Sequence, residues 1–316
     1  MSILKKSTLL IGLFLCHSSQ ICAGPSLPIE QLSVESKVER ICSRLAYGHD
    51  ALWVKSGFKV VRMDKDTLEE RVAAPLPALF RTRPFGVSED AIWVADAKKD
   101  ALYKFDTKTA ELLLEITVKL SSRHARLAFN DGVVWILNPN PADPKGQLLT
   151  AFASVSGDVR SEIALPSGGF GVVYIDGSLW VTQPITGQLL RINETDGTAL
   201  STTELGGWPG PAVLGDGFLW VYNVADATVQ RVDLDTGEVV ATIPTSLPKT
   251  PEGFMVFGGG YLWLGPVEGN VLSQVDTGTN TESHLIEGTK FRGLAFGDGS
   301  LWVCDGSAIM RLAVPD

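Results

Sequence analysis

Polar side chains recur three residues after each of a series of regularly spaced tryptophans. Six of the seven positions are polar, and four of them hold Asp96, Asn138, Asn223 and Asp305. Each follows an apolar, strand-like stretch, so we expect these oxygen donors at the ends of buried strands. Hard oxygen donors of this kind suit Ca²⁺ or Mg²⁺, or a small polar ligand.

Charged side chains precede the same tryptophans by nine to eleven residues. The positions hold Arg44, Arg83, His124 with Arg126, Glu252 and Arg292. Unpaired charges are costly at buried strand ends, so we expect these charged side chains to have oppositely charged partners or a bound ligand. Two explanations remain open. The arginines form internal salt bridges with Asp96, Asp305 and Glu252, or they serve a ligand site, where guanidinium groups bind planar anions with two parallel hydrogen bonds.

Seven of the eight tryptophans lie in one repeated phrase of the type Leu-Trp-Val. They are Trp53, Trp93, Trp135, Trp180, Trp220, Trp263 and Trp302. A period of about 40 to 45 residues built from short strands is typical of a β-propeller. Turn signals such as Asp216-Gly217 separate the strands, and no segment shows a sustained helical period. The sequence predicts an all-β fold, a seven-bladed β-propeller of four-stranded antiparallel blades.

The seven tryptophans themselves are expected to fill the space between blades. Trp208 differs, because it lies in the loop at residues 206–210, outside the repeated phrase. A loop that leads into an inner strand could place this ring against a ligand, so Trp208 is a further candidate binding residue.

The two ends of the chain are predicted to close the ring together. The last repeat ends without an outer strand, while residues 28–37 precede the first repeat. Pairing them beside residues 309–314 would remove an open sheet edge. Cys42 and Cys304 would then lie on one rim of neighbouring blades, so we expect a disulfide in an oxidising compartment. The alternative is two unpaired buried thiols.

The first 23 residues are predicted to form a signal peptide. Lys5 and Lys6 precede an apolar run at residues 9–16, and small residues surround Ala23. The run is too short to span a bilayer, so we expect residues 24–316 to form one periplasmic or secreted domain without a membrane span. The net charge of −9 and the lack of a Lys/Arg block argue against a nucleic-acid partner. We expect a monomer.

The phrase Gly-Asp-Gly-Ser-Leu-Trp-Val at residues 297–303, preceded by Phe291-Arg292-Gly293, resembles the repeat of virginiamycin B lyase and related streptogramin-lyase-like propellers. It is also similar to the broader YVTN-type seven-bladed repeat. The resemblance covers about residues 38–314 and implies a seven-bladed propeller. It also implies ring opening of an ester-linked ring by elimination, with Mg²⁺ and a histidine base. Here the matching positions hold Arg292-Gly293 and Glu252-Gly253, without histidine.

The sequence therefore favours an exported propeller that binds a small anionic ligand or a protein partner at the mouth of its central channel, without a cofactor. The candidate site comprises Arg83, His124, Arg126, Glu252 and Arg292, with Asp96, Asn138, Asn223, Asp305 and Trp208. The alternative is a virginiamycin B lyase-like or lactonase-like enzyme with Mg²⁺ or Ca²⁺ on the same face. A structural or assembly role is the third hypothesis.

Overall fold

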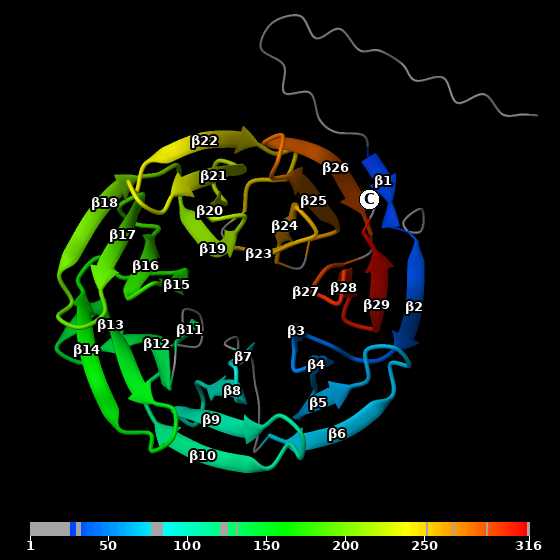
Figure 1. The fold of residues 1–316 in the computed structure, drawn as a ribbon, viewed down its shortest axis with the longest axis horizontal. Coiled ribbons are helices and arrows are strands. Elements are labelled where there is room, and N and C mark those ends of the chain that lie inside the picture. Colours follow the sequence, from blue (N-terminus) through cyan, green and yellow to red (C-terminus); the bar gives the residue numbers. More distant parts are fainter. Residues whose placement is uncertain are drawn as a thin grey trace, which may run out of the picture.

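The strands form seven blades arranged in a ring around a central axis (Figure 1). The computed structural model describes residues 26–29, 33–76, 85–120, 126–130, 132–250, 252–267, 269–288 and 290–314. The predicted signal peptide, Arg83 and His124 lie outside the described residues. The expected seven-bladed β-propeller of antiparallel blades is confirmed.

Blades 1 to 4 follow one another along the chain, each running from the axis outward. Blade 1 contains β3 (Arg44–Gly48), β4 (Ala51–Ser56), β5 (Lys59–Met63) and β6 (Glu70–Pro75). Blade 2 contains β7 (Phe85–Val87), β8 (Ala91–Asp96), β9 (Ala101–Asp106) and β10 (Leu112–Thr117). Blade 3 contains β11 (Leu127–Asn130), β12 (Val133–Asn140), β13 (Asp143–Ala153) and β14 (Val159–Leu165). Blade 4 contains β15 (Val172–Ile175), β16 (Ser178–Gln183), β17 (Gln188–Asn193) and β18 (Ala199–Glu204).

Blades 5 to 7 repeat this order, and the last two also take strands from the N-terminal segment. Blade 5 contains β19 (Pro209–Gly215), β20 (Phe218–Asn223), β21 (Thr228–Asp233) and β22 (Val239–Pro244). Blade 6 contains β23 (Gly253–Gly258), β24 (Tyr261–Pro266), β25 (Val271–Asp276) and β26 (Thr281–Glu287), with β1 (Ser26–Pro28) as a fifth strand. Blade 7 contains β27 (Gly293–Gly297), β28 (Ser300–Cys304), β29 (Ala308–Ala313) and β2 (Val34–Glu39).

The repeated tryptophans fill the space between blades, as the sequence predicts. All seven are buried. In four blades the indole N–H donates a hydrogen bond of 3.0 to 3.3 Å to the glycine that ends the inner strand. Glycine is needed there because a side chain at Gly215 or Gly297 would collide with the ring of Phe257 or Tyr47 on the next blade. In four blades a lysine or arginine lies over the indole, which adds a cation–π contact.

The N-terminal segment closes the ring, as expected. β2 pairs antiparallel with β29, from Val34 opposite Leu312 to Glu39 opposite Ala308, so it supplies the missing outer strand of blade 7. Its bounds are Val34–Glu39, slightly later than the predicted residues 28–37. The additional strand β1 pairs in parallel with β26, an arrangement that the sequence did not indicate.

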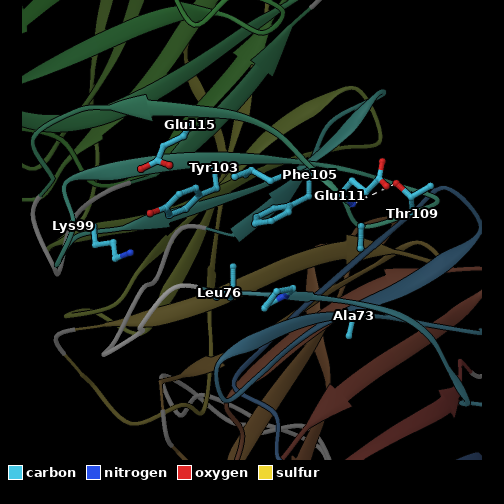
Figure 2. Close-up of a pocket in the computed structure, with 11 residues that line it drawn as sticks. Ala73, Leu76, Lys99, Tyr103, Phe105, Thr109, Glu111 and Glu115 are labelled. Carbon is cyan, nitrogen blue, oxygen red and sulfur yellow. Dashed lines mark hydrogen bonds between the residues drawn. The ribbon is translucent and has the colours of Figure 1, made fainter.

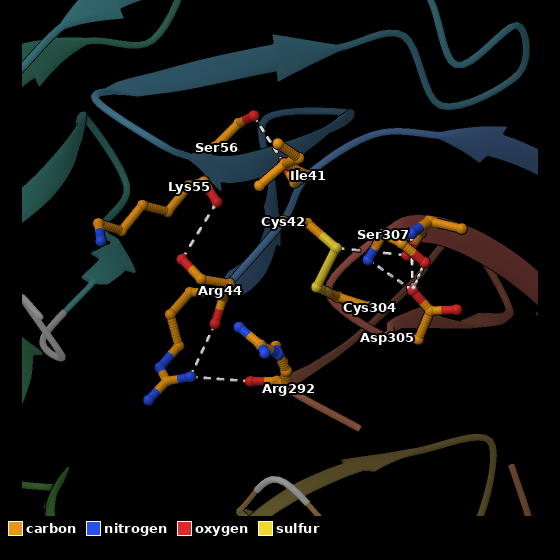
Figure 3. The surroundings of a disulfide bond; sticks show 11 residues. Ile41, Cys42, Arg44, Lys55, Ser56, Arg292, Cys304, Asp305 and Ser307 are labelled. Carbon is orange, nitrogen blue, oxygen red and sulfur yellow. Dashed lines mark hydrogen bonds between the residues drawn. A yellow bond between two sulfur atoms is a disulfide. The ribbon is translucent and has the colours of Figure 1, made fainter. Parts of the chain in front are cut away.

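The predicted disulfide joins Cys42 to Cys304 where blade 1 meets blade 7 (Figure 3). The two Cα atoms lie 6.0 Å apart, and both side chains are buried. Beside it, the Arg40 amide donates a hydrogen bond of 2.7 Å to the Ser307 carbonyl. One rim of the seam is therefore held by a covalent bond and by the backbone.

An ion network holds the same seam at the other end of β28. Arg311 on β29 lies 2.8 Å from the Glu35 carboxylate on β2 and 2.9 Å from Asp298. Lys65 of blade 1 lies 3.1 Å from Asp298. The Arg311 guanidinium also lies over the Trp302 ring, and its side chain is only 15% exposed. This network therefore ties blade 1, blade 7 and β2 together.

Replacing Arg311 with methionine is expected to lower the free energy of unfolding by about 1 to 2 kcal/mol, because it breaks a network of several ion pairs whose carboxylates are partly exposed. Urea unfolding measures the effect. The matched control is Arg71→Met, which breaks an ion pair with Asp64. The Arg71 side chain is 46% exposed, so this substitution should lower the free energy of unfolding by less than about 1 kcal/mol. Equal losses in the two variants would contradict the assignment.

The same network predicts a pH dependence. The hydrogen bond from Lys65 lowers the pKa of the Asp298 carboxyl, so the charged carboxylate stabilises the fold at neutral pH. This contribution is lost as the pH falls through the lowered pKa of Asp298, and the difference between the native protein and Arg311→Met should shrink over that range.

Candidate functional site

The inner strands enclose a cavity of about 300 Å³ in the central channel. Its walls come from five of the blades at β3, β7, β11, β23 and β27, which Figure 1 shows nearest the axis, and from Pro211 on β19. Four charged side chains lie among the lining residues: Arg44, Arg126, Glu252 and Arg292. The apolar part of the wall includes Phe85, Leu127, Phe254 and Leu294.

Three predicted site residues are brought together in this cavity. Arg126, Glu252 and Arg292 belong to blades 3, 6 and 7, and Arg44 of blade 1 joins them. Each occupies the same place in its repeat, just before the inner strand or at its first residue. These positions could be located from their distance to the tryptophans along the sequence, because the propeller repeats the same geometry in each blade.

Arg44 spans the seam between blades 1 and 7 (Figure 3). Its Nη1 donates to the carbonyl of Ser43 at 2.7 Å and to that of Arg292 at 2.8 Å. The Arg292 amide in turn donates to the Cys304 carbonyl at 2.8 Å. The orientation of both arginines is therefore coupled to the ends of β3 and β28, where the disulfide lies.

The Arg292 side chain contains a buried donor without a partner. Its Nε has no hydrogen-bond acceptor among the described residues. The side chain rests on Gly306, where φ is +100° and a Cβ would lie 2.7 Å from Nε. Glycine thus leaves room for the guanidinium beside the cavity. A buried, unpaired donor on a cation is costly, and a negative charge near the guanidinium would offset part of that cost.

Arg126 and Glu252 complete the charged lining. The Arg126 guanidinium lies 4.3 Å from the centre of the Phe170 ring, a cation–π contact that limits its orientations. The Glu252 backbone is fixed because its carbonyl accepts from the Val267 amide at 3.2 Å and the Thr250 hydroxyl at 2.9 Å. Three arginines and one glutamate leave an excess of positive charge in the lining.

A buried lysine near this cavity was not a candidate in the sequence. Lys55 on β4 is 7% exposed. Burial lowers its pKa, the Arg44 charge lowers it further, and Asp96 acts in the opposite direction. In the sequence, Lys55 directly follows the apolar run Leu52-Trp53-Val54. A charged residue at this place could have indicated a functional position. The repulsion from Arg44 supports a positive potential on this side of blade 1.

The predicted oxygen donors lie outside the cavity lining. Asp96 Oδ1 accepts from the amides of Lys98 and Lys99 at 2.9 and 3.3 Å. Asp305 Oδ1 accepts from the amides of Ser307 and Ala308 at 2.7 and 2.6 Å. Both carboxylates therefore organise the turn after the second strand, a common role for aspartate. Their binding of a ligand stays a prediction.

The two asparagines at equivalent positions also bond inside their own blades. The Asn223 amide donates to Gln230 Oε1 at 2.8 Å and to the Thr228 hydroxyl at 3.2 Å. The Asn138 amide group bonds the Thr150 hydroxyl at 2.9 Å. Within the described residues, no group of three or more His, Cys, Asp or Glu side chains could hold a metal ion.

Trp208 lies on the surface rather than in the cavity lining. Its side chain is 44% exposed, and its φ is +56°. Its carbonyl accepts a hydrogen bond of 3.2 Å from the Val224 amide, which fixes the loop. In the part of the chain that the structure describes, no helix is long and apolar enough to cross a membrane.

The fold and the channel cavity define the chain as a seven-bladed β-propeller with a charged central cavity. No family model and no curated protein sequence matches it. Among solved structures it is similar to virginiamycin B lyase from Staphylococcus aureus, with 15% identity, a TM-score of 0.70, and 89% of this chain and 99% of that chain covered.

Two further structures share the fold. A catalytically inactive variant of the same lyase with quinupristin gives a TM-score of 0.71 at 15% identity, over 89% of this chain and 99% of that chain. BamB from Moraxella catarrhalis gives 0.61 at 13% identity, over 90% of this chain and 100% of that chain. The resemblance expected from the repeat is confirmed at the level of the fold.

Proposed function

We propose that this protein is an exported propeller that binds a small anionic molecule, such as a carboxylate, in the central channel. The observation that carries the proposal is the buried Arg292 Nε without a partner, beside the cavity that Arg44 and Arg126 also line. An anion bound near this guanidinium would offset the cost of its buried charge. It would also offset the excess of positive charge among the lining residues.

The lining also indicates how a ligand would be oriented. Guanidinium groups bind a carboxylate through parallel hydrogen bonds, so Arg292 is expected to make the main charged contact. Phe85, Leu127 and Phe254 offer an apolar surface for the rest of the molecule. Glu252 would accept from a hydroxyl or amine, which would favour ligands that carry such a donor beside the acid.

Export rests on the basic and apolar N-terminal sequence and on the Cys42–Cys304 disulfide. Disulfides persist in oxidising compartments, which supports a periplasmic or extracellular location. Proteomics of culture fractions, with the mature N-terminus determined by sequencing, tests this part of the proposal. A chain that retains residues 1–23 in the cytoplasm would contradict it.

The binding test uses benzoate and succinate, each compared with its neutral amide, by isothermal titration calorimetry. We expect at least one acid to bind and its amide to bind much more weakly. Arg292→Met should weaken the acid by about 1.5 to 3 kcal/mol, roughly ten- to a hundredfold. Its melting temperature should stay close to that of the native protein.

Arg160→Met is the matched control, because Arg160 is exposed on β14 in blade 3. It should leave the affinity unchanged. If Arg292→Met instead lowers the melting temperature sharply and leaves the affinity intact, the arginines serve as internal salt-bridge partners. Repeating the titration with Mg²⁺ or Ca²⁺ and assaying for turnover distinguishes the lyase-like or lactonase-like alternative.

A further inference from the structure

A second and larger cavity, of about 600 Å³, lies between blades 1 and 2 and away from the channel (Figure 2). We call it the interblade groove. It is lined by Ala73, Pro75, Leu76, Lys99, Tyr103, Phe105, Thr109, Ala110, Glu111, Leu112 and Glu115. One wall follows the outer strand β6 of blade 1, and the other follows β9 and β10 of blade 2.

The middle of the interblade groove is apolar. The Tyr103 and Phe105 rings lie side by side with centroids 6.2 Å apart, and Leu76 faces them from blade 1 (Figure 2). Leu112 at the rim is 51% exposed. Apolar walls with a few polar groups, at a volume between about 300 and 1,000 Å³, are typical of sites for small organic molecules.

One polar group of the interblade groove is a buried tyrosine hydroxyl beside a carboxylate. Tyr103 is 1% exposed, and burial together with a hydrogen bond to Glu115 raises the pKa of its hydroxyl. This contact holds the Glu115 carboxylate at the groove, where it can accept a hydrogen bond from a ligand.

The fold itself does not require this tyrosine. The equivalent third-strand positions in the other blades hold Val61, Thr150, Leu190, Gln230, Ser273 and Met310. The polar side chains of Thr150 and Ser273 have hydrogen-bond partners, Asn138 at 2.9 Å and Glu282 at 2.6 Å. At this third-strand position, an aromatic hydroxyl is thus specific to blade 2.

The electrostatic environment favours a positive group beside that hydroxyl. Glu111 and Glu115 line the interblade groove, against the single cation Lys99, whose side chain is exposed. Burial raises the pKa of Tyr103, and the negative charges of Glu115 and Asp96 raise it further. The potential at the hydroxyl is therefore negative, and an electron-rich ring face also attracts cations.

We propose that the interblade groove binds a small amphiphilic cation, an ammonium group on an aromatic or aliphatic body. The ammonium would donate a hydrogen bond to the Glu115 carboxylate, which the Tyr103 hydroxyl helps to hold in place. The body would pack between Phe105 and Leu76. This site is separate from the anion site in the channel, since the two cavities share no lining residue.

The test compares phenylbutylamine, phenylbutanol and phenylbutyrate, which share one apolar body and differ in charge. Isothermal titration calorimetry should show saturable binding of the amine, weaker binding of the alcohol, and none of the acid. Glu115→Gln and Tyr103→Phe should each weaken the amine by about tenfold. Tyr103→Phe keeps the buried ring and removes only the hydroxyl that contacts Glu115, so the fold should tolerate it.

Glu162→Gln is the matched control, because Glu162 is exposed at the equivalent outer-strand position of blade 3. It should leave amine binding unchanged, and so should Arg292→Met. The proposal is overturned if the acid binds as well as the amine, or if no saturable amine binding occurs. Amine binding that neither Glu115→Gln nor Tyr103→Phe weakens also overturns it. So does protein self-association that buries the groove, which analytical ultracentrifugation detects.

Discussion

Removing residues 24–39 is expected to lower the free energy of unfolding by about 5 kcal/mol. The deletion takes away β2, so the edge of β29 becomes unpaired over the whole length of its ladder. It also takes Glu35 from Arg311 and uncovers apolar surface around Val38, which packs on the core shared by blades 1 and 7. The ion pair is partly exposed and contributes little, so the lost strand pairing and the lost apolar burial account for most of the effect.

Chemical unfolding of the deletion variant and the mature chain measures the difference. Removing residues 24–28 alone is the control, because it takes β1 and leaves β2 and Ile29 in place. β1 adds three residue pairs at the outer edge of blade 6, so this loss should be much smaller. Similar losses in the two variants would show that β2 is not the strand that closes the ring.

The architecture was predictable because a propeller repeats one local pattern. The phrase around Trp220, with the turn at Asp216-Gly217, specifies an inner hairpin that every blade shares. Closure of the ring then followed from a missing strand at one end of the chain and a spare strand at the other. β1 escaped prediction because Ser26–Pro28 is too short to show any periodicity, and its parallel partner lies in another blade.

The candidate site was predictable only in part, because the position of a residue in the repeat gives its place in the blade but not its contacts. From these positions, Arg126, Glu252 and Arg292 were expected at the channel, and they line one cavity there. The repeat also placed Asp96 at the end of a strand, but its carboxylate binds turn amides, which depends on local backbone geometry. In the sequence, Tyr103 looks like an ordinary strand residue, and its place beside a groove depends on the packing of blade 1 against blade 2.

Replacing both Cys42 and Cys304 with serine is expected to lower the free energy of unfolding by roughly 5 kcal/mol. The two cysteines are 262 residues apart, so the bond restricts the unfolded chain over almost its whole length. Denaturant unfolding of the native protein with and without reductant, beside the double variant, measures the loss. An unchanged midpoint on reduction, with the thiols shown to be free, would contradict the expectation.

The same substitution should also weaken the channel site, which links the seam to the proposed function. The Arg292 amide bonds the Cys304 carbonyl, and Arg44 bonds the Arg292 carbonyl across the seam at 2.8 Å. Without the disulfide, blades 1 and 7 separate more readily, and both guanidinium groups lose part of their fixed orientation. We therefore expect benzoate or succinate to bind more weakly to the double serine variant, while phenylbutylamine binds the interblade groove as before. Equal weakening of both probes would instead indicate general loosening of the ring.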